Sequence, residues 1–253
     1  MSTDVTGKDV QWSHDGTLLR GYLASPPGGD PRPGLVLVPD VRGLGEHYRD
    51  VARRFAAEGF RTLALDIYSR EGAPDLGDMD AVQRWIRRLP DRRVLGDVRA
   101  ARDWLAAQPG TGPRLGVTGF CLGGQYTLMA ACTLPDLSAA VSWYGMLRYA
   151  ETDEVKPESP LAMAPRLACP YLGLFGDEDA LIPVADVEEL RATLAANGKR
   201  FEIVRYPGAG HAFFNDTRPD AYRPEASRDG FRRATAFLRT HLAVGGRRRA
   251  PLR

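Results

Sequence analysis

Short apolar runs alternate with amphipathic segments along most of this chain, and no other feature constrains its fold as strongly. Runs such as 35–39 and 171–176 have the length and composition of strands buried on both faces. Segments such as 45–59 and 91–108 place apolar residues at helical spacing between such runs. This alternation predicts an α/β fold, with one mostly parallel sheet covered by helices on both faces.

The two ends of the chain extend this prediction. The Asp15-Gly16 pair is a tight-turn signal between two strand-like segments, so we expect the chain to begin with a hairpin. No linker divides the residues that follow, and we predict a single domain over residues 1–243. Residues 244–253 are basic and lack an apolar period, so we predict a disordered tail there.

Charge and composition argue against several classes of partner. The 34 basic and 32 acidic side chains leave a formal charge of +2, too small an excess to suggest a nucleic-acid or membrane partner. The first residues lack the apolar core of a signal peptide, so we expect a cytoplasmic protein. The three cysteines lack metal-ligand spacing, and no phosphate-binding glycine motif follows a strand. We therefore expect neither a metal nor a cofactor.

Cys121 stands between Gly119 and Gly123, after a predicted strand and before a predicted helix. Gly-x-Cys-x-Gly is the cysteine form of the nucleophile elbow, a sharp strand-to-helix turn in which larger side chains at the glycine positions would collide. The start of a helix also favours the thiolate, which is the reactive form. The alternative is a small core residue, because free cysteines are usually buried and inert. Cys132 and Cys169 lack the glycine frame and are predicted to be packing residues.

A nucleophilic thiol needs a base, and the base needs an orienting carboxylate. Of the four histidines, His211 lies in a glycine-bearing loop between a predicted strand and the last helix, where catalytic residues are expected. A loop histidine bonded to the backbone is the alternative. Another predicted strand is followed by three acidic residues, of which we favour Asp179, then Asp177, then Glu178. The resulting order of nucleophile, acid and base is that of the α/β-hydrolases.

These motifs resemble those of the dienelactone hydrolase (carboxymethylenebutenolidase-like) family of α/β-hydrolases. The resemblance covers residues 8–242 and rests on GFCLGG, GDEDALIP, GAGHAFFND and VPDVRGLGEHYRDVARRFAAEGFRTLALDIY. It implies Asp179 as the acid, because the family's acid precedes the proline of its motif by four residues. It also implies that Asp40 takes the thiol proton and that the N–H groups of Val41 and Leu122 form the oxyanion hole.

Two positions depart from the family's pattern. The family has a glutamate at the position of Asp40, with a side chain one methylene longer. It also has an arginine four residues after the histidine to hold the substrate carboxylate. This chain has Asn215 there, which cannot form a charged bidentate clamp. Arg84, Arg87 and Arg88 are alternative sources of a cation, or else a solvated helix face.

Together these residues predict a cysteine-dependent hydrolase that acts on a small-molecule ester or lactone by acyl transfer to water. The segment 146–167 is expected to cover the site, with Met146, Tyr149 and Met163 as candidate lining residues. The same triad could instead serve thioester cleavage, C–C cleavage, or an elimination or cyclisation in a biosynthetic pathway. A non-catalytic binding protein is a further alternative. We expect a monomer or a homodimer.

Overall fold

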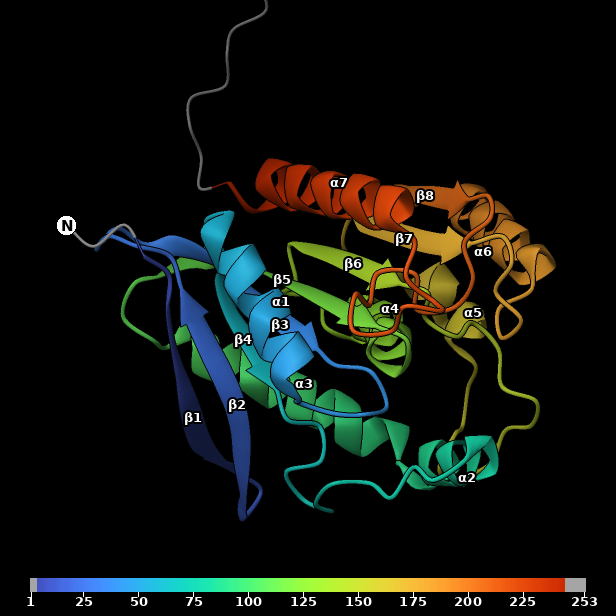
Figure 1. The fold of residues 1–253 in the computed structure, drawn as a ribbon, viewed down its shortest axis with the longest axis horizontal. Helices are drawn as coiled ribbons and strands as arrows, with labels where there is room; N and C mark the ends of the chain where they lie inside the picture. The colour runs from blue at the N-terminus through green and yellow to red at the C-terminus, as the bar shows by residue number, and fades with distance from the viewer. Residues whose placement is uncertain (1–3, 244–253) are drawn as a thin grey trace, which may run out of the picture.

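In residues 4–243, which the computed structural model describes, eight strands form one sheet in the order β1-β2-β4-β3-β5-β6-β7-β8 (Figure 1). The strands are β1 (Thr6–His14), β2 (Thr17–Ser25), β3 (Arg32–Val38), β4 (Arg61–Leu65), β5 (Thr111–Phe120), β6 (Ala139–Trp143), β7 (Tyr171–Gly176) and β8 (Phe201–Tyr206). The helices are α1 (Glu46–Ala57), α2 (Met79–Arg88), α3 (Asp91–Ala106), α4 (Leu122–Thr133), α5 (Pro160–Met163), the 3-10 turn η1 (Ala164–Arg166), α6 (Val184–Ala196) and α7 (Pro224–Leu242). The predicted tail at 244–253 lies outside the described residues.

The sheet is antiparallel only at its N-terminal side. β1 and β2 form the predicted hairpin, and β2 pairs with β4 in the antiparallel direction. Asp15 and Gly16 both have positive φ, as a two-residue hairpin turn of this hand requires. From β4 to β8, neighbouring strands run parallel, so their carboxyl ends meet at one edge of the sheet.

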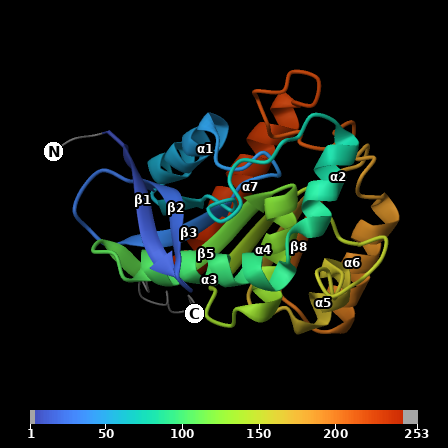
Figure 2. The ribbon, with the colours of Figure 1, turned by 90° about the horizontal axis from the view of Figure 1, so that it is seen from below.

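The helices cover both faces of the sheet. α1 and α7 lie on one face, and α3 and α4 lie on the other (Figures 1 and 2). α3 and α4 contact each other as well as β5, and α7 packs against β5 and β6. The predicted α/β architecture with a single mostly parallel sheet is therefore confirmed.

Two helical segments, α5 and η1, have no counterpart among the predicted elements, and α2 corresponds to the helix face considered for Arg84, Arg87 and Arg88. The N-terminus of α2 has a local signal, because the Asp78 carboxylate accepts a hydrogen bond from the N–H of Ala81 at 2.7 Å. α5 and η1 lie in a stretch rich in proline, where proline occupies the first turn of each segment.

A cluster of aromatic rings lies beneath the carboxyl edge of the central strands. Phe120, the last residue of β5, stacks on Trp143 at the end of β6, with 5.2 Å between ring centroids. Phe214 packs against both rings, at 5.1 and 4.6 Å. Each such pair contributes about 0.5–1.5 kcal/mol beyond the area that it buries. The cluster thus fixes three segments relative to one another: the end of β5, the end of β6 and the loop that follows β8.

Candidate active site

The turn from β5 into α4 places Cys121 at the carboxyl edge of the sheet. Its backbone has φ 54° and ψ −116°, and its N–H donates to the carbonyl of Trp143 at 3.0 Å. A Cβ on Gly119 would lie 2.3 Å from the carbonyl oxygen of Gly123, and a Cβ on Gly123 would lie 2.0 Å from that of Val38. Only glycine fits at either position. The local structure is the one that the Gly-x-Cys-x-Gly pattern predicts.

Backbone strain is concentrated near this edge. Of the four non-glycine residues with positive φ in the described part of the chain, Asp15 lies in the hairpin turn. The other three are Cys121, Tyr144 and Ala212, which lie directly after β5, directly after β6 and in the loop after β8. Each such residue costs on the order of 1–3 kcal/mol, a cost that recurs at functional sites.

The structure brings His211 and Asp179 together. His211 Nδ1 lies 2.8 Å from Asp179 Oδ2, and the Asp179 side chain is fully buried. The N–H of Leu181 donates to the other oxygen, Asp179 Oδ1, at 2.8 Å. The other two acidic candidates lie elsewhere: Asp177 pairs with Arg205, and Glu178 is exposed. Of the three, Asp179 is therefore the one that orients the histidine.

The second ring nitrogen of His211 is buried and has no hydrogen-bond partner of good geometry among the described residues. Burial alone lowers the pKa of His211. The charge of Cys121 and the hydrogen bond with Asp179 outweigh burial and raise this pKa to about 10. The thiol, the imidazole and the carboxylate thus interact as one electrostatic group.

Asp40 and Val41 follow β3 at the same edge, and both are buried. Burial raises the pKa of the Asp40 carboxyl, while a hydrogen bond from the N–H of Arg42 and an interaction with Tyr48 oppose that rise. Within the part of the chain that the structure describes, the N–H groups of Val41 and Leu122 donate to no other protein group. Both N–H groups are therefore available to an added acceptor.

The candidate lining residues lie in different environments. Met146 is half-buried and Met163 is buried. The Tyr149 hydroxyl donates to Asp91 at 2.9 Å and accepts from the side-chain amide of Gln125 at 2.7 Å. Tyr149 therefore ties the covering segment to α3 and α4 through a polar network.

The candidate cations and Asn215 also lie in different environments from one another. The Asn215 oxygen accepts from the N–H and the hydroxyl of Thr217, at 3.0 and 2.6 Å, so it stabilises a local turn. Arg84, Arg87 and Arg88 are exposed on α2, and none forms an ion pair within residues 4–243.

Two residues near the site were not among the predicted ones. Tyr144 is buried, packs edge-on against His211 with 5.2 Å between ring centroids, and its hydroxyl has no hydrogen-bond partner in the described chain. Burial, followed by the charges of Asp40 and Cys121, raises its pKa well above the usual range, and the positive charge of Arg218 opposes that rise. Arg218 is half-buried, and its side chain has no ion pair or hydrogen bond within the described residues. Arg218 lies two residues after the GAGHAFFND motif, but nothing in that motif indicates that its charge acts on Tyr144, which follows a different strand.

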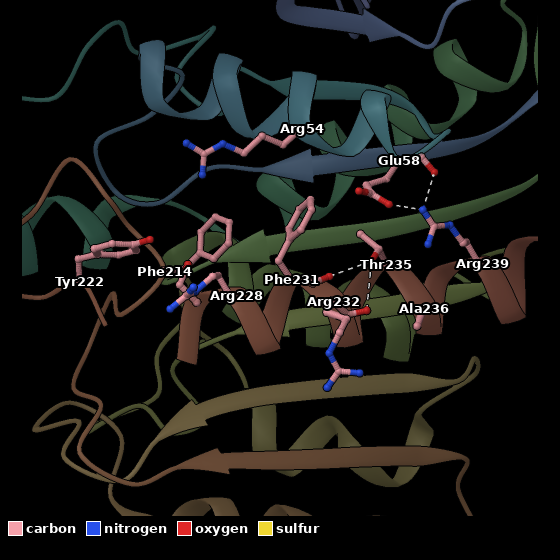
Figure 3. A pocket seen from close by; sticks show the side chains of 11 residues that line it. Arg54, Glu58, Phe214, Tyr222, Arg228, Phe231, Arg232, Thr235, Ala236 and Arg239 are labelled. Carbon is pink, nitrogen blue, oxygen red and sulfur yellow. Dashed lines mark hydrogen bonds and ion pairs between the residues drawn. The ribbon is translucent and has the colours of Figure 1, made fainter. Parts of the chain in front are cut away.

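A cavity of about 380 Å³ opens between α1 and α7 and contains none of the predicted site residues (Figure 3). Phe214 and Phe231 form part of its apolar wall, and Arg54 and Arg228 lie at one end. Phe214 also belongs to the aromatic cluster under Cys121. The cavity therefore shares one ring with that cluster, and Arg54 in its lining also bonds Asp216, which pairs with His47.

Comparison with known proteins identifies the family. The sequence model of the dienelactone hydrolase family matches residues 19–242. The chain belongs to this family. A protein of Salmonella typhimurium (strain LT2), provisionally named a carboxymethylenebutenolidase, is 39% identical over 92% of this chain and 86% of its own length. A Bradyrhizobium protein, provisionally named a 2-oxo-3-(5-oxofuran-2-ylidene)propanoate lactonase, is 36% identical over 96% of this chain and 98% of its own.

A solved structure agrees with these relatives. The crystal structure of a provisionally named dienelactone hydrolase from Klebsiella pneumoniae subsp. pneumoniae matches with a TM-score of 0.88 and 36% identity, over 92% of this chain and 98% of that one. The predicted family and the predicted class of enzyme, a hydrolase of esters or lactones, are confirmed. No helix within residues 4–243 is long and apolar enough to cross a membrane. The cytoplasmic location and the oligomeric state stay predictions.

Proposed function

We propose that this dienelactone hydrolase family member hydrolyses a lactone or ester through a covalent thioester on Cys121. One observation carries the proposal: His211 is oriented by a buried carboxylate, while its second ring nitrogen is left without a partner beside the thiol. A histidine that bonds through both ring nitrogens has none free for proton transfer. This one keeps a nitrogen for proton transfer.

The reaction follows from this arrangement in two steps. His211 takes the proton of the Cys121 thiol, the sulfur attacks the substrate carbonyl, and the N–H groups of Val41 and Leu122 stabilise the oxyanion. The tetrahedral intermediate collapses, the C–O bond breaks, and His211 protonates the departing alkoxide. Water then attacks the thioester with His211 as the base, which releases the acid and restores the thiol. Asp179 holds the imidazole in the orientation that both proton transfers require.

We further propose that the substrate carries a carboxylate. The names of the two relatives above denote butenolide and furanone substrates with a carboxylate side chain. Asn215 cannot provide a cation for such a group, and its oxygen is bonded to Thr217. Arg218 supports the proposal, because its guanidinium has no partner within the described residues and its charge acts on Tyr144, whose hydroxyl is also unpartnered there. Arg84 is the second candidate.

The test compares hydrolysis of cis-dienelactone and a short p-nitrophenyl ester by the parent and by three variants. Cys121→Ala should abolish turnover of both substrates. Arg218→Met should raise KM for the charged lactone and leave the uncharged ester unaffected. The same rise in Arg84→Met, with Arg218→Met like the parent, would assign the carboxylate to the second candidate instead. Ester hydrolysis by Cys121→Ala at the parent rate would contradict the cysteine mechanism. Turnover of neither substrate by the parent would favour the thioester, C–C cleavage or cyclisation chemistries.

A further inference from the structure

The four residues Asp40–Gly43, which follow β3, form a tight turn held from within. The N–H of Gly43 donates to the carbonyl of Asp40 at 3.0 Å, which closes the turn. The N–H of Arg42 donates to the Asp40 carboxylate oxygen Oδ1 at 2.8 Å. This second bond is an Asx turn, in which a short side chain accepts from the backbone two residues later. A glutamate is one methylene too long for the same geometry.

Tyr68, just after β4, holds the turn from outside. Its hydroxyl donates to the carbonyl of Val41 at 2.8 Å, and its side chain is buried. Its ring also packs against Gly43, where an added Cβ would lie 2.8 Å from the ring and where φ is +78°. Trp85 of α2 covers the other side of the tyrosine, edge-on at 5.8 Å. The tyrosine therefore has little freedom to move away from the turn.

These bonds fix two consecutive peptide planes. The Val41–Arg42 peptide is held at its carbonyl by Tyr68 and at its N–H by Asp40. The Asp40–Val41 peptide is held at its carbonyl by Gly43. Because a trans peptide is planar, with its carbonyl and N–H pointing in opposite directions, holding the Asp40 carbonyl also aims the Val41 N–H. That N–H has no partner of its own within the described residues.

We propose that Asp40 and Tyr68 are positioning residues that aim the Val41 N–H at the developing oxyanion, and that Asp40 does this as a hydrogen-bond acceptor in the turn. This inference rests on the proposed function, in which Val41 provides one of the two oxyanion donors. It assigns the aspartate a role that depends on its short side chain. The competing role, activation of the thiol by the aspartate's negative charge, makes opposite predictions for a neutral isostere.

The experiment uses Asp40→Asn, Asp40→Ala and Tyr68→Phe, with kcat and KM for a short p-nitrophenyl ester. Asparagine keeps the side-chain oxygen that accepts from Arg42, so its kcat should stay near that of the parent. The other two variants lose one bond of the turn, and their kcat should fall about 10- to 100-fold with little change in KM. Tyr22→Phe, which removes the hydroxyl of another buried tyrosine, one that accepts from Arg53 and makes no bond to the turn, is the matched control.

A second readout separates positioning from activation of the thiol. The rate of Cys121 alkylation by iodoacetamide is measured against pH for each variant. Positioning predicts the parent's pH profile in all of them, because none touches the nucleophile. A kcat for Asp40→Asn as low as that of Asp40→Ala, together with a shifted alkylation profile, would overturn the proposal in favour of thiol activation.

The outcomes also distinguish this inference from the proposed function. If Cys121→Ala is inactive while Tyr68→Phe and Asp40→Ala keep the parent's kcat, the cysteine mechanism stands and the positioning role is wrong. If Cys121→Ala keeps activity, the proposed function fails first and the positioning role fails with it. Urea unfolding of every variant identifies any that do not fold. Tyr68→Phe and Asp40→Asn, the two conservative changes, decide the question even if Asp40→Ala is unfolded.

Discussion

Asp179 and Asp91 are both buried carboxylates that face a basic side chain, at 2.8 Å from His211 and 2.7 Å from Lys156. Around Asp91 the bonding is complete. Its oxygens accept from Lys156, from the Tyr126 hydroxyl at 3.0 Å and from the Tyr149 hydroxyl at 2.9 Å. Lys156 also donates to Tyr126 at 2.9 Å.

The two pairs therefore differ in what they leave open. The Asp91 pair bonds the segment 146–167 to the start of α3 and to α4, and both oxygens of Asp91 accept hydrogen bonds. The Asp179 pair leaves one buried nitrogen of His211 without a partner at the thiol. Because buried polar atoms are normally satisfied, the unpartnered nitrogen of His211, together with its place beside Cys121, makes this histidine a candidate for proton transfer. Charge and burial alone would not distinguish the two pairs.

The largest effect expected from this comparison is on catalysis at the open pair. His211→Gln can still donate a hydrogen bond toward Asp179 but cannot accept or deliver the proton, so kcat should fall about 10³-fold or more. The free energy of unfolding, measured in urea, should change by only about 1 kcal/mol. A stability loss without a loss of kcat would place this pair in the same structural class as Asp91–Lys156.

The next effect is on stability at the closed pair. Lys156→Met leaves the buried Asp91 charge uncompensated and should lower the free energy of unfolding by about 3–5 kcal/mol. Turnover of the short ester should stay close to the parent's. Lys8→Met, which changes an exposed lysine on β1, is the control and should unfold like the parent. A variant of Lys156 with parent stability and low kcat would show that this network belongs to the active site.

The smallest effect concerns His47, a largely buried histidine that belongs to neither the Asp179–His211 pair nor the Asp91–Lys156 pair. Burial lowers the pKa of His47 below 6.5, although the charges of Asp216 and Asp40 oppose that shift. The folded protein therefore takes up this proton less readily than the unfolded chain does. The contribution of neutral His47 to the free energy of unfolding is therefore present above pH 6.5 and is lost as the pH falls below that value.

The measurement is the urea midpoint at pH 7.5 and at pH 5.0. The parent should lose more stability than His47→Gln between these two values. His14→Gln, in the half-exposed hairpin turn, should behave like the parent. An equal loss in His47→Gln and in the parent would assign the acid sensitivity to other groups.

Much of the site could be predicted from the sequence because its information is local. The elbow requires glycine at 119 and 123, because at each position a backbone carbonyl lies where a Cβ would be. His211 and Asp179 each follow a strand, and parallel strands bring their carboxyl ends to one edge. The alternation of apolar runs predicted the sheet for the same reason, because the composition of each run indicates by itself that the strand is buried.

The remainder depends on contacts between distant segments. Nothing near Lys156 indicates that its partner is Asp91, which is 65 positions away. Tyr149 was predicted as a lining residue from its place in the covering segment, and the bonds of its hydroxyl emerge only when α3 and α4 pack together. Tyr68 meets the turn at Val41 from the end of a neighbouring strand. Such pairs are fixed by tertiary packing, which a pattern of local residues does not encode.

The burial of two of the three cysteines has a practical consequence. Burial raises the pKa of Cys132 and of Cys169 to about 12, so both stay protonated and shielded at neutral pH. Cys121 is half-exposed. A native sample treated with a chromogenic thiol reagent should therefore release one equivalent of dye per correctly folded molecule, and three once unfolded. Labelling of Cys121 therefore counts the correctly folded active sites in a sample. The same cysteine is a single point at which a probe or a surface can be attached.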